Sequence, residues 1–197
     1  MLHGTGVDVL AADDRAFAAL SPVRTPNGIV AIAHRRATEA GAILQHPRAF
    51  VVVIVDVQDP GNVGAVVRVA EAGGATGMIV CGDSASPFSW KAVRGSMGSV
   101  LRLPVARAIA VTSVLDDIQH AGLIRIASVP RDGADPDIID WSGRAAVLLG
   151  GEANGLPATV VAACDRHVTI PMNSPVESLN VATSAAILIY AARRARQ

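Results

Sequence analysis

The chain is poor in aromatic residues and in cysteine. Aromatic side chains make up 3% of its 197 residues, so few rings are available for a surface that binds RNA mainly by stacking on bases. The two cysteines, Cys81 and Cys164, lack the paired spacing of a zinc site or a disulfide framework. The sequence therefore indicates neither a structural metal nor a disulfide scaffold, and it fits a reducing compartment such as the cytoplasm.

Long hydrophobic runs and an excess of charge of either sign are also missing. No apolar run reaches the ~18 residues of a membrane span, and the first residues lack a basic segment followed by an apolar one. We therefore expect neither a membrane segment nor a signal peptide. The formal net charge is +0, which argues against a protein that coats nucleic acid by bulk electrostatics.

Lysine is almost absent, and arginine carries nearly all the basic charge. Lys91 is the only lysine among the 17 Lys and Arg residues. Guanidinium groups bind phosphate and carboxylate through a planar fork, so a local anion site is compatible with a neutral chain. A gene whose base composition favours arginine codons explains the same excess equally well.

Aliphatic side chains are abundant. Hydrophobic residues make up 51% of the chain, chiefly Ala, Val, Ile and Leu, which is typical of a buried parallel sheet covered by helices. From Phe50 onward, apolar runs of strand length alternate with helix-like segments, without hairpin turns between neighbouring strands. This pattern predicts an α/β fold with a parallel sheet flanked by helices. The predicted strands are 50–57, 77–82, 100–105, 123–129, 145–151 and 166–172, and the predicted helices are 62–74, 86–95, 112–121, 156–164 and 178–194.

The first residues differ from this regular pattern. Residues 7–10 and 28–33 resemble strands and residues 13–20 resemble a short helix, which is too little chain to bury a core of its own. We expect residues 1–33 to be the remnant of a truncated N-terminal domain and residues 34–49 to be a linker. Residues 50–197 are expected to form the main domain.

Three loops that follow predicted strands carry polar side chains, at the sheet edge where ligands bind in open α/β folds. The first is Asp59–Gly64, with Arg68 one turn further along the helix. The second is Gly150–Pro157, in which Glu152 follows two glycines. The third, Ile170–Asn180, leads into the apolar final helix. Polar groups held at the end of a rigid element suit ligand binding.

Each loop also has a simpler structural interpretation. In that interpretation Arg68 pairs with Glu71 on the helix surface, and Asn154 caps a strand-to-helix turn. Ser178 caps the last helix, and Asn180 satisfies its first turn.

The first loop matches neither the GxGxxG spacing of dinucleotide folds nor the GxxxxGK[ST] spacing of a P-loop, which argues against a nucleotide-linked oxidoreductase.

Taken together and in order, the loops resemble the three motifs of the SpoU (TrmH-like) family of RNA ribose 2′-O-methyltransferases, part of the SPOUT superfamily. The resemblance covers residues 50–194, and Gly151 and Ala153 stand where many members have Asn and Gly. The matching residues are Asn62, Gly64 and Arg68; Gly150, Glu152, Gly155 and Leu156; Ile170, Pro171, Met172, Ser178, Leu179 and Asn180; and, in a fourth segment, Ser96, Gly98, Leu103, Pro104 and Val105.

The resemblance implies a C-terminal deep trefoil knot of the SPOUT type and S-adenosylmethionine as the cofactor, with no metal. Apolar side chains make physical sense as walls for the adenine ring, while backbone groups supply hydrogen bonds. The cofactor-binding residues that the resemblance implies are Gly150, Gly151, Ile170, Met172 and Leu179.

The same resemblance implies a catalytic set of Arg68, Asn62, Glu152, Ser178 and Asn180. In the family, the residue matching Arg68 is assigned as the base that activates the ribose 2′-hydroxyl. Because a guanidinium pKa exceeds ~12, an equally good interpretation is that Arg68 grips the adjacent phosphate and aligns the ribose. The other residues would position Arg68, the ribose and the methyl donor, and Glu152 is expected beside Arg68.

The expected substrate is RNA, and ribosomal RNA is favoured. Pro26-Asn27-Gly28 resembles the end of the N-terminal RNA-binding domain found in a subgroup that methylates ribosomal RNA. The alternatives are a tRNA 2′-O-methyltransferase and a non-catalytic RNA-binding or ribosome assembly factor with the same fold. The apolar last helix predicts a homodimer formed through the knotted region.

Overall fold

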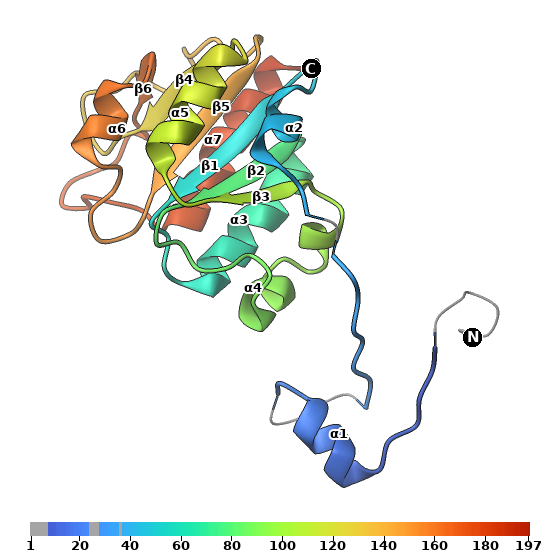
Figure 1. The fold of residues 1–197 in the computed structure, drawn as a ribbon. Helices are drawn as coiled ribbons and strands as arrows, with labels where there is room; N and C mark the ends of the chain where they lie inside the picture. Colours follow the sequence, from blue (N-terminus) through green and yellow to red (C-terminus); the bar gives the residue numbers. More distant parts are fainter. Residues whose placement is uncertain (1–7, 24–27, 36) are drawn as a thin grey trace. The chain divides into compact units, whose positions relative to one another are not determined.

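A computed structural model describes residues 8–23, 28–35 and 37–197 of the chain (Figure 1). The chain divides into two units, residues 1–36 and 37–197. In the first unit the predicted helix is confirmed as α1, Asp14–Leu20. The side chain of Asp13 caps it by accepting a hydrogen bond from the Ala16 amide over 2.8 Å, and α1 buries none of its residues.

The strand predictions for the first unit are wrong. The described residues of the two segments, 8–10 and 28–33, form no strand. Leu10 and Ile32 are 90% and 92% exposed, and an isolated extended segment without a partner strand is not stable. Val7 and the dipeptide Pro26-Asn27, on which other expectations rest, lie outside the described residues.

The second unit is built on a six-stranded sheet in the order β3-β2-β1-β5-β4-β6, and all its registered strand pairs are parallel. The predicted parallel α/β sheet is thus confirmed. The chain moves outward from β1 to β3 and then returns to the other side of β1, so the order reverses between β1 and β5. The strands are β1 Phe50–Val55, β2 Gly77–Cys81, β3 Val105–Ala108, β4 Ile124–Ser128, β5 Ala145–Gly150 and β6 Arg166–Val168.

Helices cover both faces of this sheet (Figure 1). On one face, α3 and α7 close a core that includes Val63, Leu188 and Ile189, and α4 packs on the outside of α3. On the other face, α2, α5 and α6 close a second core. The helices are α2 Ala40–Leu44, α3 Pro60–Gly73, α4 Trp90–Gly95, α5 Val111–His120, α6 Ala158–Ala162 and α7 Val181–Ala195, with a short 3-10 helix η1 at Ser99–Leu101.

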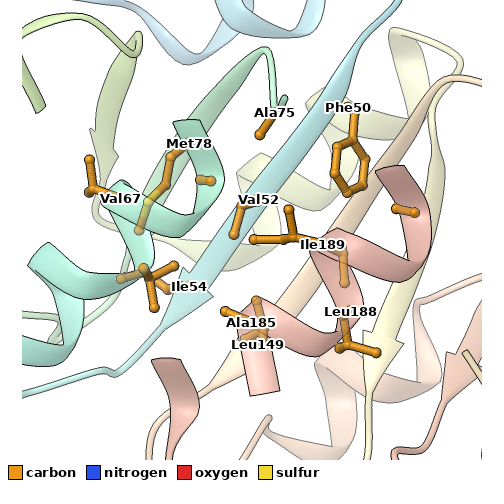
Figure 2. Close-up of a cluster of buried hydrophobic side chains, with 14 of the residues drawn as sticks. Phe50, Val52, Ile54, Val67, Ala75, Met78, Leu149, Ala185, Leu188 and Ile189 are labelled. Atoms are coloured by element: carbon orange, nitrogen blue, oxygen red, sulfur yellow. The ribbon is translucent and has the colours of Figure 1, made fainter. Parts of the chain in front are cut away.

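The central strand β1 is buried on both faces, which explains its continuous apolar run. Phe50, Val52 and Ile54 belong to the core beneath α3 and α7, where Figure 2 shows Phe50 and Val52 near Ile189 of α7. The valines between them belong to the core on the opposite face. Side chains of a strand alternate between its faces, so each helical layer packs on every second residue.

Several element boundaries differ from the predictions. The segment expected to be a linker, 34–49, contains α2, whose Ile43 and Leu44 are buried. The strand predicted at 100–105 is wrong: that segment contains η1, and β3 begins only at Val105. Pro104, which has no amide hydrogen to donate to a ladder, immediately precedes β3.

Helices α4 and α7 begin later than predicted, whereas α3 begins two residues earlier, at Pro60. The helix predicted from Ser86 begins at Trp90, because Ser89 provides the cap and accepts a hydrogen bond from the Ala92 amide. The last helix begins at Val181. Among the described helices, none has the length and apolar character needed to cross a bilayer.

Candidate active site

Side chains from the three loops meet at the carboxyl edge of the sheet, beside the point where the strand order reverses. Asn62 lies in the first turn of α3, Glu152 follows β5, and Asn180 precedes α7. The side-chain amide of Asn62 donates a hydrogen bond to Glu152 Oε1. The side-chain amide of Asn180 donates to Asn62 Oδ1 over 3.1 Å. The three predicted residues therefore form one hydrogen-bonded set, with Asn62 in the middle.

The start of α3 is fixed by a charged cap that also orients Asn62. Asp59 Oδ1 accepts hydrogen bonds from the amides of Gly61 and Asn62 over 2.5 and 3.2 Å. The Lys91 ammonium of α4 lies 2.8 Å from Asp59 Oδ2. The hydrogen bond from Lys91, followed by that from the Gly61 amide, lowers the pKa of Asp59 below its ordinary value of 3.8. The carboxylate is thus kept ionised as a helix cap.

Asn180, rather than Ser178, caps the last helix. Its Oδ1 accepts from the amides of Ala182 and Thr183 over 2.9 and 3.4 Å, so the interpretation of Ser178 as the cap is wrong. This use of the oxygen leaves the Asn180 side-chain nitrogen free to bind Asn62. One side chain therefore both starts α7 and joins it to α3.

The glycines of the second loop are required by close backbone contacts. A Cβ on Gly151 would overlap the carbonyl oxygen of Asp56, at the end of β1. A Cβ on Gly150 would overlap the backbone of Gly155 and Leu156. The loop folds back on itself through a hydrogen bond from the Gly155 amide to the Gly151 carbonyl over 2.9 Å. Only glycine allows this turn so close to the neighbouring strand.

A cavity of about 500 Å³ lies against this loop. Its volume falls within the range of small-molecule sites, roughly 300–1,000 Å³. All five residues predicted to bind the cofactor line it, together with two of the predicted catalytic residues. Asn62, Arg68 and Asn180 do not line it, although Asn62 is bonded to Glu152, which does. The predicted residues in the wall are Gly150, Gly151, Glu152, Ile170, Met172, Ser178 and Leu179.

Part of the cavity wall comes from residues that the sequence motifs do not include. Ser128 ends β4, Val129 and Pro130 follow it, and all three line the cavity. The Thr169 hydroxyl holds this segment in place, because it accepts from the Gly133 amide over 2.8 Å and donates to the Val129 carbonyl over 3.1 Å. In the sequence, only their position after a predicted strand could have identified these residues, since the carboxyl end of β4 reaches the same edge of the sheet.

Arg68 is exposed on α3, and its surroundings differ from both expectations. Glu71 forms a forked pair with Arg102, with distances of 2.6 and 2.8 Å, so the expected Arg68–Glu71 pair is wrong. Glu152 binds Asn62, and no hydrogen bond or ion pair joins it to Arg68. Within the part of the chain that the structure describes, the side chain of Arg68 makes no hydrogen bond or ion pair. Its guanidinium is free to meet an anion.

No group of three or more His, Cys, Asp or Glu residues in the described ranges is arranged to hold a metal ion. The fold and this edge define an α/β protein with a small-molecule cavity beside its switch point, bordered by a hydrogen-bonded Asn–Glu–Asn set.

Comparisons with known proteins agree with that class. Residues 49–190 match the model of the SpoU rRNA Methylase family. The chain is 31% identical over 187 residues to RlmP of Bacillus subtilis (strain 168), named a 23S rRNA (guanosine(2553)-2'-O)-methyltransferase, which covers 94% of this chain and 73% of that protein. The chain belongs to the SpoU rRNA methylase family.

Solved structures are similar over the same region. An AdoMet-bound rRNA methyltransferase from Sinorhizobium meliloti superposes with a TM-score of 0.77 at 33% identity, over 81% of this chain and 61% of that chain. The SpoU methyltransferase AviRb from Streptomyces viridochromogenes, in complex with AdoMet, gives a TM-score of 0.75 at 31% identity, over 81% and 65%. The chain spans about half the length of several other curated relatives that it matches.

Proposed function

We propose that this chain transfers the methyl group of S-adenosylmethionine to a ribose 2′-hydroxyl of RNA, with ribosomal RNA the favoured substrate. The observation that carries the proposal is the hydrogen-bonded set of Asn62, Glu152 and Asn180 beside a cavity of about 500 Å³. Family membership supports it, as do the two similar structures that contain AdoMet and the relative that acts on 23S rRNA.

The cavity suits S-adenosylmethionine in size and in chemistry. Ile170, Met172 and Leu179 offer apolar walls for the adenine ring. Gly150 and Gly151 let the cofactor approach the backbone, whose polar groups supply hydrogen bonds. When bound, the cofactor supplies a sulfonium methyl group that an oxygen nucleophile can attack.

The chain must then hold the ribose and help its hydroxyl lose a proton, because a free hydroxyl is a weak nucleophile. We assign Arg68 to the phosphate next to the target ribose, since its guanidinium has no carboxylate partner in the described chain and guanidinium groups bind phosphate through a planar fork. Gripping that phosphate would align the 2′-oxygen with the methyl group. Asn62 and Asn180 fix the Glu152 loop, and Ser178 lines the cavity proposed for the cofactor.

We further infer a C-terminal trefoil knot of the SPOUT type and a homodimer formed through α7. In support of the knot, loop 129–134 is hydrogen-bonded to the chain at the end of β6. The Thr169 hydroxyl donates to the Val129 carbonyl, and the Thr169 amide donates to the Ala134 carbonyl, directly before Ile170 at the cavity. In support of the dimer, Ile187 and Tyr190 of α7 are 38% and 44% exposed. Light scattering at micromolar concentration is expected to give twice the chain mass, and a monomer would contradict the dimer.

The proposed substrate also assigns the protein to the cytoplasm, where ribosomes are made and used. Residues 1–33 remain a candidate piece of an RNA-binding domain, and residues 50–197 the candidate methyltransferase domain, with 34–49 between them.

The test is a methyl-transfer assay with labelled S-adenosylmethionine and three unmodified transcripts: 23S rRNA, 16S rRNA and a tRNA pool. We expect incorporation into ribosomal RNA at a ribose 2′-oxygen, located by resistance of that position to alkaline cleavage. Incorporation into tRNA alone would support the tRNA alternative. RNA binding without incorporation, in protein that binds the cofactor in calorimetry, would support the assembly-factor alternative and overturn the proposal.

A further inference from the structure

Helix α4 and the turn after it present an aromatic ring, a guanidinium and a thioether to solvent. Trp90 and Arg94 are four residues apart, so they share one helix face, and Met97 lies in the turn that follows the helix. Trp90 is 46% exposed and Met97 is 68% exposed. We call Trp90, Arg94 and Met97 the α4 surface.

The exposure of Trp90 is unusual for this chain, which has only two tryptophans. The other, Trp141, is buried: its indole N–H donates to the Pro136 carbonyl over 2.9 Å and its ring packs edge-on against Phe50. No corresponding hydrogen bond of the Trp90 indole is present among the described residues. Half of a large apolar ring is therefore left facing water.

Helix α4 lies beside the candidate active site, because it packs directly on the first turn of α3. A Cβ on Gly64 would overlap the Ala92 carbonyl and lie 3.0 Å from the Ser96 amide nitrogen. The Lys91 ammonium reaches the Asp59 cap of α3, from which Asn62 is oriented. The helix that carries Trp90 is thus fixed to the turn that carries Asn62.

Arg68 belongs to the same side of α3. Gly64, Arg68 and Glu71 are spaced by four and three residues, so they form one stripe along the helix. At one end of the stripe Gly64 contacts α4, and at the other end Glu71 binds Arg102, which directly follows η1. Arg68 therefore lies between these two contacts, on the side of α3 that faces the segment joining α4 to η1.

This region carries positive charge that nearby carboxylates do not neutralise. Lys91 is paired with Asp59, and Arg102 with Glu71. In the described chain, the guanidinium of Arg94, like that of Arg68, has no hydrogen-bond or ion-pair partner. An exposed indole and two unpaired guanidinium groups on the packed helices α3 and α4 complement a polyanion with planar bases, which matches a nucleic-acid strand better than an apolar protein surface.

We propose that the α4 surface binds the RNA strand next to the methylated nucleotide, with Trp90 stacked on an unpaired base and Arg94 against a phosphate. RNA is read in this way where its bases are unstacked, through aromatic rings and guanidinium groups. The inference rests on the proposed RNA methyltransferase activity and adds to it a substrate-binding surface outside the cofactor cavity.

Intrinsic fluorescence provides the first test, because Trp141 is buried and Trp90 is exposed. The wild-type protein is titrated with a 12-nucleotide oligo(A) and with a 23S rRNA transcript. We expect saturable quenching with both RNAs, and we expect it to be absent from Trp90→Phe protein titrated in the same way. Quenching of equal depth in Trp90→Phe, or no quenching of the wild type by RNA that it methylates, would overturn the proposal.

Kinetics provide the second test. Trp90→Ala and Arg94→Ala are expected to raise the KM for RNA about ten-fold each, while the KM for S-adenosylmethionine stays at the wild-type value. Trp90→Phe keeps an aromatic ring and should recover most of the loss. Ile138→Ala, which removes a 77% exposed apolar side chain in the β4–β5 loop, is the matched control and should match the wild type.

Different results would contradict the proposed methyltransferase activity and the proposed role of the α4 surface. If the wild type neither binds S-adenosylmethionine nor methylates RNA, the proposed function is wrong. If the wild type methylates RNA while Trp90→Ala and Arg94→Ala keep its KM for RNA, only the α4 surface is wrong.

Discussion

The side chains of Asn62 and Asn180 are hydrogen-bonded to each other although 118 residues separate them in the sequence. Each is already committed to its own helix: Asn62 lies in the first turn of α3, and Asn180 caps α7. Because Asn62 also donates to Glu152, a single amide couples both helix starts to the wall of the cavity. Both positions require an amide side chain, since each asparagine donates a hydrogen bond through its nitrogen and accepts another through its oxygen.

Replacement of Asn62 by aspartate tests this coupling. Asn62→Asp removes the donor to Glu152 and sets a second carboxylate against it, so the Glu152 loop should move away. A hydrogen bond to a charged group contributes ~1.5–3 kcal/mol, so we expect kcat to fall at least about ten-fold. Asn173→Asp adds the same charge at an exposed position of the β6–α7 loop and is the control. Equal kcat values for the two variants would show that the set does not support catalysis.

Replacement of Arg68 separates a phosphate clamp from a base. Arg68→Ala should abolish methylation but leave the S-adenosylmethionine Kd unchanged, because Arg68 does not line the cavity. Arg68→Lys keeps the charge and loses the fork, so a clamp predicts weak turnover with an unshifted pH profile. Near-normal turnover with a shifted pH profile would instead identify a base.

Arg102→Ala is the control for the Arg68 variants. It removes a guanidinium that faces the same side of α3, and it breaks the pair with Glu71 and a long hydrogen bond to the Ser99 hydroxyl. Exposed ion pairs contribute about 0–1 kcal/mol, so a small fall in Tm and normal turnover are expected. Loss of cofactor binding in Arg68→Ala but not in Arg102→Ala would assign Arg68 a structural role.

Much of the fold could be predicted because the strands have a strong local signal. The run from Phe50 to Val55 is apolar throughout, and only a strand buried on both faces needs such a run. The strand predicted at 100–105 failed because an apolar run of that length has no period that separates a strand from a helical turn. The strands predicted near the N-terminus failed because strand pairing is a tertiary property that residues 28–33 do not carry locally.

The site could be predicted only in part, for a similar reason. Motif order identified Asn62, Glu152 and Asn180, and the structure brings these side chains together. The motif order did not reveal that Glu71 binds Arg102, because the pairing between α3 and the segment after η1 depends on how α4 packs. Ser128–Pro130 carry no distinctive chemistry, so only the sheet order places them at the cavity.

The charged cap of α3 predicts a pH dependence of stability. The pKa of Asp59 is lowered from 3.8 in the folded chain, chiefly by Lys91, so folding favours the ionised carboxylate. The stabilisation is present above the unfolded value and is lost as the pH falls through the lower folded value. Asp59→Asn keeps a capping oxygen without the charge. We expect the Tm difference between wild type and Asp59→Asn to shrink as the pH is lowered below 3.8.

Salt provides an independent check on the same pair. Asp59 and Lys91 are both exposed, so 1 M NaCl, which shortens the Debye length to ~3 Å, should weaken their attraction and reduce that Tm difference near neutral pH. A difference that is insensitive to both acid and salt would mean that the carboxylate acts only as a hydrogen-bond acceptor.

The close approach of β5 to β1 predicts opposite outcomes for two glycine-to-alanine changes. In Gly151→Ala the new methyl group would overlap the Asp56 carbonyl, so the Glu152 loop or the end of β1 must shift. Such overpacking costs ~1–3 kcal/mol. Because the loop lines the cavity, the Kd for S-adenosylmethionine should rise as Tm falls.

In Gly143→Ala the methyl group meets no atom within 4 Å and φ is not in the left-handed region. That change lowers only the entropy of the unfolded chain, so Tm should stay level or rise, by the equivalent of ~0.4–1 kcal/mol. Thermal melts and calorimetry of both variants check the pair, and a Gly151→Ala protein with wild-type Tm and Kd would show that the loop yields without cost.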